Sequence, residues 1–236
     1  MHLAILPFHE ISIIDLENLA RRSVPNAKLR KPGASQFRYR SYLAGRCAIS
    51  ILFKTQNLDY RVKPNIPFGF LEVVDPNGIS VKNLYMNISH TDEVSVAVLS
   101  NNPVGIDIEN RDRNAMRVLS RIATEREKDW VNDQFFVSQK LEVRRDIFLW
   151  SSKEAASKAF GLGMKFGLKT FEILPHHTGP NFRVSTNTNG PLKVDHPVVE
   201  FGLWDKYVIT VCGAESSVLR GVDRRIIGMA EVQAFR

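Results

Sequence analysis

Cysteine is scarce in this chain of 236 residues, which contains only Cys47 and Cys212. Two cysteines so far apart are too few for a disulfide framework or for a metal site built from thiolates. Small proteins that depend on several disulfides are therefore excluded as a class. We expect both cysteines to be small apolar side chains in the core.

Long apolar runs are also missing. No segment approaches the roughly 20 apolar residues that a membrane-spanning helix needs. The first residues, Met1 to Ile14, lack the basic start of a signal peptide, and Glu10 interrupts their apolar run. The sequence therefore predicts a soluble, cytoplasmic protein, whose length suits one large domain or two small ones.

Acidic residues are absent from one stretch, Arg21 to Arg46, which holds eight lysines and arginines. The whole chain has 32 basic and 25 acidic residues, so its formal net charge is +7. This balance favours an anionic partner, which can be a nucleic acid, a nucleotide-like cofactor or an acidic protein. Composition does not choose among these partners, and a basic cluster is often only solvated surface.

The order of helical and strand-like segments indicates the class of fold. Helix patterns cover Gln36 to Lys54, Thr124 to Trp130 and about Gln139 to Phe160, whereas strand patterns cover Leu84 to Ile88, Val94 to Leu99 and Val104 to Ile108. The runs Val198 to Leu203 and Tyr207 to Cys212 are predicted to form a hairpin. Each half thus has a long helix and antiparallel strands. We predict an α+β protein of two similar subdomains that meet near residues 100 to 110.

The segment Val104-Gly105-Ile106-Asp107-Ile108-Glu109 carries the first candidate site residues. Side chains alternate along a strand, so Asp107 and Glu109 share a face with Gly105, opposite three apolar residues. We expect the apolar face to be buried and the acidic face to be open, with room for a ligand beside the glycine. One or two carboxylates completed by substrate phosphates are the usual ligands of Mg²⁺. Two solvated acids at a strand end are the alternative.

The segment Trp150-Ser151-Ser152-Lys153-Glu154-Ala155-Ala156-Ser157-Lys158 carries the second group. On a helix, one arc holds Trp150, Lys153, Glu154, Ser157 and Lys158, and the opposite arc holds Phe148, Leu149, Ala155, Ala156 and Ala159. We expect the apolar arc to pack in the core and the polar arc to face a cleft. There Glu154 and Lys158 form an i,i+4 pair, for which a simple surface ion pair is the alternative.

A third group, Asn87-Ile88-Ser89-His90, ends a predicted strand just before the hairpin that bears the acids. If that hairpin brings His90 beside the acids, the imidazole can donate to a phosphate, as the hydroxyl of Ser89 can. A capped histidine in a turn is the alternative.

These three segments, in this order and spacing, resemble the 4′-phosphopantetheinyl transferases of the Sfp type. The upstream Tyr42-Leu43-Ala44-Gly45-Arg46 resembles the basic N-terminal helix of that family, so the resemblance spans about residues 30 to 165. It implies a pseudo-dimer of two α+β halves, 1–104 and 105–236, with coenzyme A and Mg²⁺ held in the cleft between them. The first half would bind the nucleotide of coenzyme A, and the second would carry the metal-site acids and the catalytic helix.

The resemblance also implies roles for individual residues, which fall into three sets. The metal ligands would be Asp107, Glu109 and Glu154; the nucleotide end and phosphates of coenzyme A would be bound by Lys31, Arg40, Arg46, Asn87, Ser89, His90 and Lys158; and the catalytic residues would be Asp107, Glu154 and Lys158. Among the catalytic residues, Glu154 is the expected general base. Lys158 would hold the pyrophosphate and offset charge that develops on the phosphoryl oxygens.

The implied reaction is the Mg²⁺-dependent transfer of 4′-phosphopantetheine from coenzyme A to a serine hydroxyl of an acyl or peptidyl carrier protein. Adenosine 3′,5′-bisphosphate is released. Carrier proteins of this class are acidic, which suits the positive charge of the chain. We expect a monomer, because two halves in one chain complete the cleft, and neither a nucleic acid nor a membrane as partner.

Two other functions stay open. A Mg²⁺-dependent nuclease also needs clustered acids with a lysine, and a basic protein suits nucleic acid. Its lysine usually follows an acid by two residues on a strand, whereas Lys158 follows Glu154 by four on a helix. A non-catalytic module that binds coenzyme A or a carrier protein is the second alternative, although it has no reason to keep Asp107, Glu109, Glu154 and Lys158 together.

One loop departs from the family. Pro67-Phe68-Gly69-Phe70-Leu71 stands where family members often carry Gly-Lys-Pro, and it has no lysine. The departure weakens the expectation for contacts on the adenine side of coenzyme A and leaves the metal site unaffected.

Overall fold

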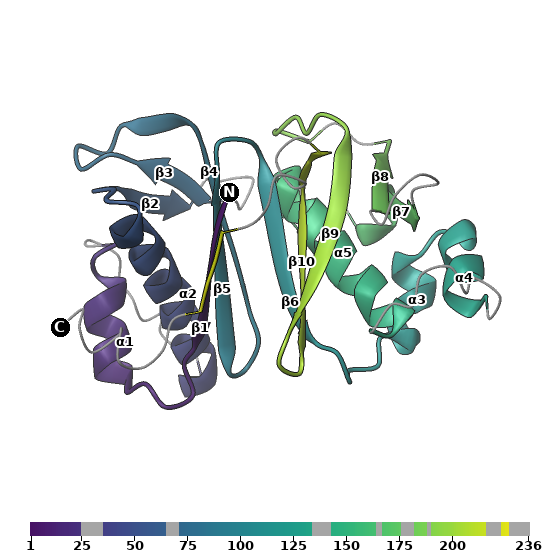
Figure 1. Cartoon of the computed structure of the whole chain (residues 1–236), viewed down its shortest axis with the longest axis horizontal. Helices are drawn as coiled ribbons and strands as arrows, with labels where there is room; N and C mark the ends of the chain where they lie inside the picture. Colours follow the sequence, from purple (N-terminus) through teal and green to yellow (C-terminus); the bar gives the residue numbers. More distant parts are fainter. Residues whose placement is uncertain are drawn as a thin grey trace. The chain divides into compact units, whose positions relative to one another are not determined.

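A computed structural model describes residues 1–24, 35–64, 71–133, 143–163, 167–175, 182–187, 190–215 and 223–226 of the chain. These residues form two units, which are described separately (Figure 1). The first unit contains the described residues up to 101 together with 223–226, and the second contains those from 102 to 215. The predicted halves, 1–104 and 105–236, differ from this division in two respects. The boundary lies at 101/102 rather than at 104/105, and residues 223–226 belong to the first unit.

The first unit is a six-stranded sheet with two helices. Its strands are β1 His2–Pro7, β2 Arg61–Pro64, β3 Leu71–Val74, β4 Ser80–His90, β5 Val94–Ser100 and β11 Asp223–Ile226, and its helices are α1 Ile13–Ala20 and α2 Gln36–Thr55. The strands lie in the order β11-β1-β5-β4-β3-β2. Every neighbouring pair is antiparallel except β1 and β11, which are parallel. The pairing with β1 is what assigns β11 to this unit.

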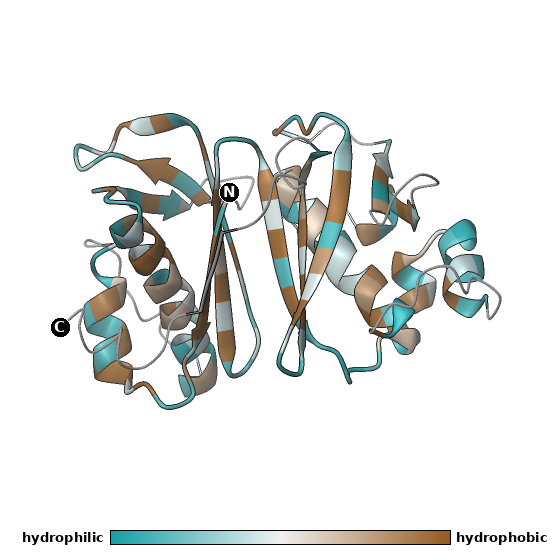
Figure 2. Ribbon diagram, viewed as in Figure 1, coloured by the Kyte–Doolittle hydropathy of each residue, from teal (hydrophilic) through white to brown (hydrophobic). Residues whose placement is uncertain are grey.

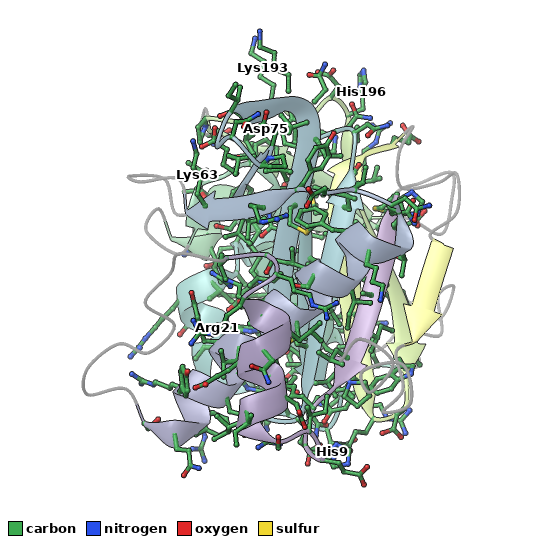
Figure 3. The ribbon with its side chains drawn as sticks, turned by 90° about the vertical axis from the view of Figure 1, so that its left-hand side faces the viewer. His9, Arg21, Lys63, Asp75, Lys193 and His196 are labelled. Carbon is green, nitrogen blue, oxygen red and sulfur yellow. The ribbon has the colours of Figure 1, made fainter. Side chains whose placement is uncertain are left out.

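Helix α2 is the long helix that the sequence predicts for the first half. Ser35 caps its start by accepting a hydrogen bond from the backbone N–H of Arg38. Leu43, Cys47 and Ile51, four residues apart, are buried where the helix packs on β1, β4 and β5. Exposed polar side chains of this unit, among them His9, Arg21 and Lys63, lie around its outside (Figure 3).

The face of β4 that α2 covers is marked by a close approach. A Cβ on Gly45 of α2 would lie 3.0 Å from Cδ1 of Ile88 in β4. Because side chains alternate along a strand, Asn87 and Ser89 lie on the opposite face of the sheet from Ile88. Of the three residues of β4 that are predicted to contact the nucleotide, Asn87 and Ser89 therefore share one face of the sheet. His90 is separate from them, as the last residue of the strand.

The second unit is a five-stranded antiparallel sheet with three helices and a short 3₁₀ turn. Its strands are β6 Val104–Asn110, β7 Phe171–Pro175, β8 Phe182–Thr186, β9 Pro197–Trp204 and β10 Tyr207–Ala214, and its helical segments are α3 Met116–Ile122, α4 Glu125–Asn132, α5 Arg145–Ala159 and η2 Leu168–Thr170. The strand order is β6-β10-β9-β8-β7. The predicted hairpin is present as β9 and β10. Asp205 in its two-residue turn has φ of 52°, the left-handed conformation that such turns require.

Helix α5 begins later and ends where the sequence predicts. Residues 139–142 of the predicted helix lie outside the described residues, and the helix begins at Arg145. At its end Gly161 has φ of 69°, as expected of a glycine that follows a helix C-terminus. The predicted apolar arc is confirmed, because Phe148, Leu149, Ala155, Ala156 and Ala159 are all fully buried.

Both units match the predicted class of fold. Each packs one long helix, α2 or α5, on a sheet whose strands are mainly antiparallel, so the α+β class with two similar subdomains is confirmed. Figure 2 shows apolar and polar residues alternating along β6, the strand with the candidate acids. No helix within the described ranges is long and apolar enough to cross a membrane.

Candidate active site

Helix α5 lies against the face of β6 that carries Gly105 and Asp107. A Cβ on Gly105 would stand 1.9 Å from the carbonyl oxygen of Ala155 and 2.5 Å from the backbone nitrogen of Ala159. Only glycine permits so close an approach of helix and strand. The prediction that this face of β6 is open, with room for a ligand beside the glycine, is therefore wrong. The room is filled by α5, and the residues from Val104 to Glu109 are buried.

Asp107 is held by donors from α5. Its Oδ2 accepts a hydrogen bond of 2.9 Å from the hydroxyl of Ser151, and its Oδ1 accepts one of 2.9 Å from Nζ of Lys158. Thr210 lies opposite Asp107 on β10, and its hydroxyl is 2.7 Å from that of Ser151. Lys158 also donates to the carbonyl oxygen of Ile106. Asp107 and Lys158, both predicted site residues, thus form an ion pair in which the carboxylate is 2% exposed.

Glu109 is held by an arginine and a tryptophan. Nη1 of Arg113 donates to both carboxylate oxygens, at 2.8 and 2.7 Å, and Nε1 of Trp150 donates to Oε1 at 2.7 Å. The guanidinium lies 5.6 Å from the centre of the Trp150 ring. Burial and the nearby Asp107 raise the pKa of Glu109, and the bonds from Arg113 and Trp150 oppose that rise.

Glu154 completes the group of three acids. Its pKa is raised to about 7, first by burial and then by the negative charges of Asp107 and Glu109. Lys158 opposes these effects, and its Nζ lies 4.0 Å from Oε2 of Glu154. The structure therefore brings the three predicted acids and Lys158 together at the contact between β6 and α5.

The polar arc predicted for α5 is narrower than expected. Lys153 is fully buried, and its Nζ pairs with Glu127 of α4 at 2.8 Å and donates to the carbonyl oxygens of Leu168 and Phe171. Ser157 is 2% exposed. Placing Lys153 and Ser157 on an open face was therefore wrong. Residues of α4, η2 and the start of β7 surround Nζ of Lys153, and the hydroxyl of Ser157 donates to the carbonyl oxygen of Gly163.

The basic candidates in the first unit have structural partners of their own. Nη2 of Arg40 donates to the carbonyl oxygens of Phe8, His9 and Ile11, which ties α2 to the segment between β1 and α1. The guanidinium of Arg46 stacks 4.4 Å from the ring centre of Tyr42. Burial lowers the pKa of Arg46, and its buried Nε has no hydrogen-bond partner among the residues that the structure describes. Lys31 lies outside the described residues.

The nucleotide candidates of β4 differ in exposure. Asn87 is buried, Ser89 is half-buried and His90 is exposed. The predicted role of these residues in binding coenzyme A stays a prediction.

The donor set suits a hard cation, although no finished cage is present. Across the described ranges, no three acidic, histidine or cysteine side chains are arranged to hold a metal ion. Asp107 and Glu109 are instead bonded to Lys158, Arg113 and Trp150. Mg²⁺ usually binds one or two carboxylates together with water and substrate phosphates, so a complete protein cage is not required. The repulsion among three acids, which contributes to the raised pKa of Glu154, is what a bound cation would relieve.

Three residues that hold the site acids in place were not predicted from the sequence. Arg113 follows Glu109 by four residues in the turn after β6, a spacing that gives no helical or strand signal there. Ser151 stands inside the recognised motif beside more conspicuous residues. Thr210 has no local signal at all, because only the pairing of β10 with β6 brings it to Asp107.

Known proteins are similar to the part of the chain that contains the three acids and Lys158. A sequence model described as the 4′-phosphopantetheinyl transferase superfamily matches residues 103–212. The chain is 31% identical over 136 residues to the 4′-phosphopantetheinyl transferase gsp of Aneurinibacillus migulanus, a match that covers 58% of this chain and 54% of that protein. It is 24% identical over 178 residues to the 4′-phosphopantetheinyl transferase Sfp of Bacillus subtilis strain 168, covering 75% of this chain and 74% of that protein.

Among solved structures, the holo-[acyl-carrier-protein] synthase of Thermotoga maritima matches at 21% identity over 47% of this chain and 61% of that one, with a TM-score of 0.34. In the sequence comparison, the matched part of the chain spans about half the length of the Aneurinibacillus relative. The sequence matches confirm the predicted resemblance to the Sfp-type enzymes. Residues 103–212, which contain Asp107, Glu109, Glu154 and Lys158, are the part of the chain that matches the model of the 4′-phosphopantetheinyl transferase superfamily.

Proposed function

We propose that this protein transfers the 4′-phosphopantetheine group of coenzyme A to a serine hydroxyl of an acyl or peptidyl carrier protein, with Mg²⁺ as cofactor. The observation that carries the proposal is the meeting of Asp107, Glu109 and Glu154 beside Lys158. A group of acids, two of which (Glu109 and Glu154) have a raised pKa, next to a lysine suits a site for a cation and a phosphorylated ligand. This group lies within the segment that matches the superfamily.

The carboxylates of Asp107, Glu109 and Glu154 would hold the metal. A bound Mg²⁺ supplies positive charge next to the pyrophosphate of coenzyme A, which stabilises the departing group. Lys158 adds a second positive charge on the same side, and its bonds to Asp107 and to the carbonyl oxygen of Ile106 hold it in place. The close contact between Gly105 and Ala155 holds the strand and the helix together, which positions these side chains for both tasks.

Glu154 is our candidate for the general base. Without a bound cation its pKa is about 7, so the carboxylate is partly ionised at neutral pH and can accept a proton. The serine oxygen forms a bond to the phosphorus that bears pantetheine, while the bond from this phosphorus to the bridging oxygen of the pyrophosphate breaks. Adenosine 3′,5′-bisphosphate leaves with the electron pair, and the hydroxyl proton passes to the Glu154 carboxylate.

The first unit supplies the candidates for the nucleotide end of coenzyme A. Within the described part of the chain, the buried Nε of Arg46 has no hydrogen-bond partner, which suits an anionic ligand. Asn87, Ser89 and His90 offer further donors. Arg40 is a weaker candidate, because three backbone carbonyls already accept from its Nη2. An acidic carrier protein would suit the net charge of +7, and we propose that the protein acts as a monomer.

Mass spectrometry tests the proposed reaction directly. An apo carrier protein is incubated with coenzyme A, Mg²⁺ and the full chain, and a gain of one phosphopantetheine group on its serine is expected. Omission of Mg²⁺ should prevent the gain. If several fatty-acid, polyketide and peptide carrier proteins all remain unmodified, the proposal is wrong. Parallel incubation with DNA and RNA checks the nuclease alternative.

Variants test the site itself. Asp107→Ala and Glu154→Ala should abolish transfer while circular dichroism remains that of a folded protein. Asp112→Ala is the matched control, because Asp112 is an exposed acid in the turn after β6. Full activity in either site variant would contradict the assignment of these acids.

A further inference from the structure

Arg113 stands in an unusual position at Glu109. A single nitrogen, Nη1, lies 2.8 Å from Oε1 and 2.7 Å from Oε2 of the carboxylate. The two distances are nearly equal, so this nitrogen lies close to the line that bisects the two oxygens. A cation chelated by both oxygens of a carboxylate takes the same place. Arg113 thus fills one of the positions from which Glu109 could bind a metal ion.

The two donors on Glu109 differ in how easily they can leave. Trp150 belongs to α5, which is fixed against β6, and its indole is half-buried. The Arg113 side chain is 55% exposed and follows the end of the strand. A long, solvated side chain can turn into water at little cost. The guanidinium is therefore the exchangeable donor, and the indole stays to orient the carboxylate.

The charge of Arg113 also acts on the rest of the acid group. Its guanidinium interacts electrostatically with Asp107 and Glu154 as well as with Glu109. It therefore offsets part of the negative charge of three neighbouring acids, which is the task of the proposed metal. Two positive charges at one carboxylate would repel each other, so the arginine and a divalent ion exclude each other at this position.

We propose that Arg113 is a built-in counter-ion of the acid group, which a divalent cation must displace from Glu109 before it can bind there. The inference rests on the proposed function, because it takes Asp107, Glu109 and Glu154 as the metal-binding acids. Displacement has a cost, so Arg113 lowers the affinity for the cation and stabilises the acid group while no cation is bound. Arg113 is thus a residue that sets metal affinity, and it is not itself a ligand.

The test measures metal binding directly. Binding of Mn²⁺ to the full chain is followed at pH 8 from the electron paramagnetic resonance signal of the free ion, without coenzyme A. Arg113→Gln leaves a shorter polar side chain without charge, and Arg113→Lys keeps the charge. Arg117→Gln is the matched control, because Arg117 is an exposed arginine on α3.

We expect Arg113→Gln to bind Mn²⁺ about fivefold more tightly than the natural protein, since a partly exposed ion pair of ordinary strength is lost. Arg113→Lys should bind more weakly than Arg113→Gln, and Arg117→Gln should bind as the natural protein does. Without metal, Arg113→Gln should melt at a lower temperature, and Mn²⁺ should raise that temperature more than in the natural protein.

Equal or weaker Mn²⁺ binding by Arg113→Gln would overturn the inference. If the natural protein still modifies a carrier protein in that case, the proposed function stands and only the role of Arg113 falls. If the natural protein neither binds Mn²⁺ nor modifies any carrier protein, the proposed function fails as well.

Discussion

Gly105 of β6 lies beneath Ala155 of α5, so close that a Cβ on the glycine would stand 1.9 Å from the alanine carbonyl oxygen. This contact sets the distance between the strand that bears Asp107 and the helix that bears Lys158. We predict that Gly105→Ala displaces α5, because backbone atoms rather than a flexible side chain meet the new methyl group. The expected loss is about 1–3 kcal/mol of unfolding free energy, as for overpacked cores, measured by urea denaturation.

The same variant should also lose transfer activity, because the ion pair between Asp107 and Lys158 depends on the position of the helix. Gly45→Ala is a suitable control for stability. There the new methyl would meet the ends of two side chains, Cδ1 of Ile88 at 3.0 Å and Oγ of Ser95 at 3.7 Å, within a helix that favours alanine. Unchanged stability and activity of Gly105→Ala would show that α5 can move without consequence.

The parts of the fold that follow from local patterns were predictable from the sequence. The helix α2, the hairpin of β9 and β10 and the glycine end of α5 each carry a signal within a few neighbouring residues. The candidate acids were found in the same way, because a strand and a helix with known spacing fix which residues share a face.

The remaining features depend on contacts between distant segments. Lys153 has the spacing of an exposed residue, and only the cover of α4, η2 and β7 makes it a buried one. The role of Gly105 depends on the packing of α5. The assignment of β11 to the first unit depends on its pairing with β1, more than 200 residues earlier in the chain. Periodicity describes a face of an element and does not say what will cover it.

The buried ion pair of Lys153 and Glu127 gives a second prediction. Both side chains are fully buried, and the Glu127 carboxylate also accepts from the backbone N–H groups of Thr124 and Ile173. Lys153→Met should leave that carboxylate without its positive partner. We expect a loss of about 3–5 kcal/mol, the usual cost of breaking a buried pair from one side, measured as the unfolding free energy in urea.

Lys128→Met is the control for this prediction. Lys128 pairs with Glu125 on the surface of α4, and such a pair contributes less than about 1 kcal/mol. Equal effects of the two substitutions would mean that the pair of Lys153 and Glu127 does not anchor α5.

Asp146, in the first turn of α5, gives a prediction for acid stability. Burial alone would raise its pKa, but hydrogen bonds from Arg144 and from the backbone N–H of Ala115 lower the pKa below its ordinary value. Because the folded pKa is depressed, the stabilisation is present above the unfolded value of about 3.9 and is lost as the pH falls through the folded value.

We therefore expect Asp146→Asn to reduce the unfolding free energy at pH 7 by about 1–3 kcal/mol. The difference from the natural protein should shrink as the pH falls below about 4. Thermal melts between neutral and acidic pH measure it, with the exposed Asp129→Asn as control. A difference that stays constant with pH would contradict the charge-based account.

For Glu154 we predict that the unfolding free energy depends on pH in the opposite direction. Burial and the charges of Asp107 and Glu109 raise its pKa from the usual 4.5 to about 7, so the folded protein binds a proton that the unfolded chain has released. A raised folded pKa contributes stability that is fully present below pH 4.5 and is lost as the pH rises through about 7.

Without divalent cations, the natural protein should therefore lose on the order of 2 kcal/mol relative to Glu154→Gln between pH 4.5 and pH 8. Urea denaturation across this range measures the difference, and Glu215→Gln, a substitution at an exposed glutamate, should show none. If the three acids form the metal site, saturating Mg²⁺ should restore the stability of the natural protein at pH 8 and leave Glu154→Gln almost unchanged, because the cation replaces the proton among the same carboxylates.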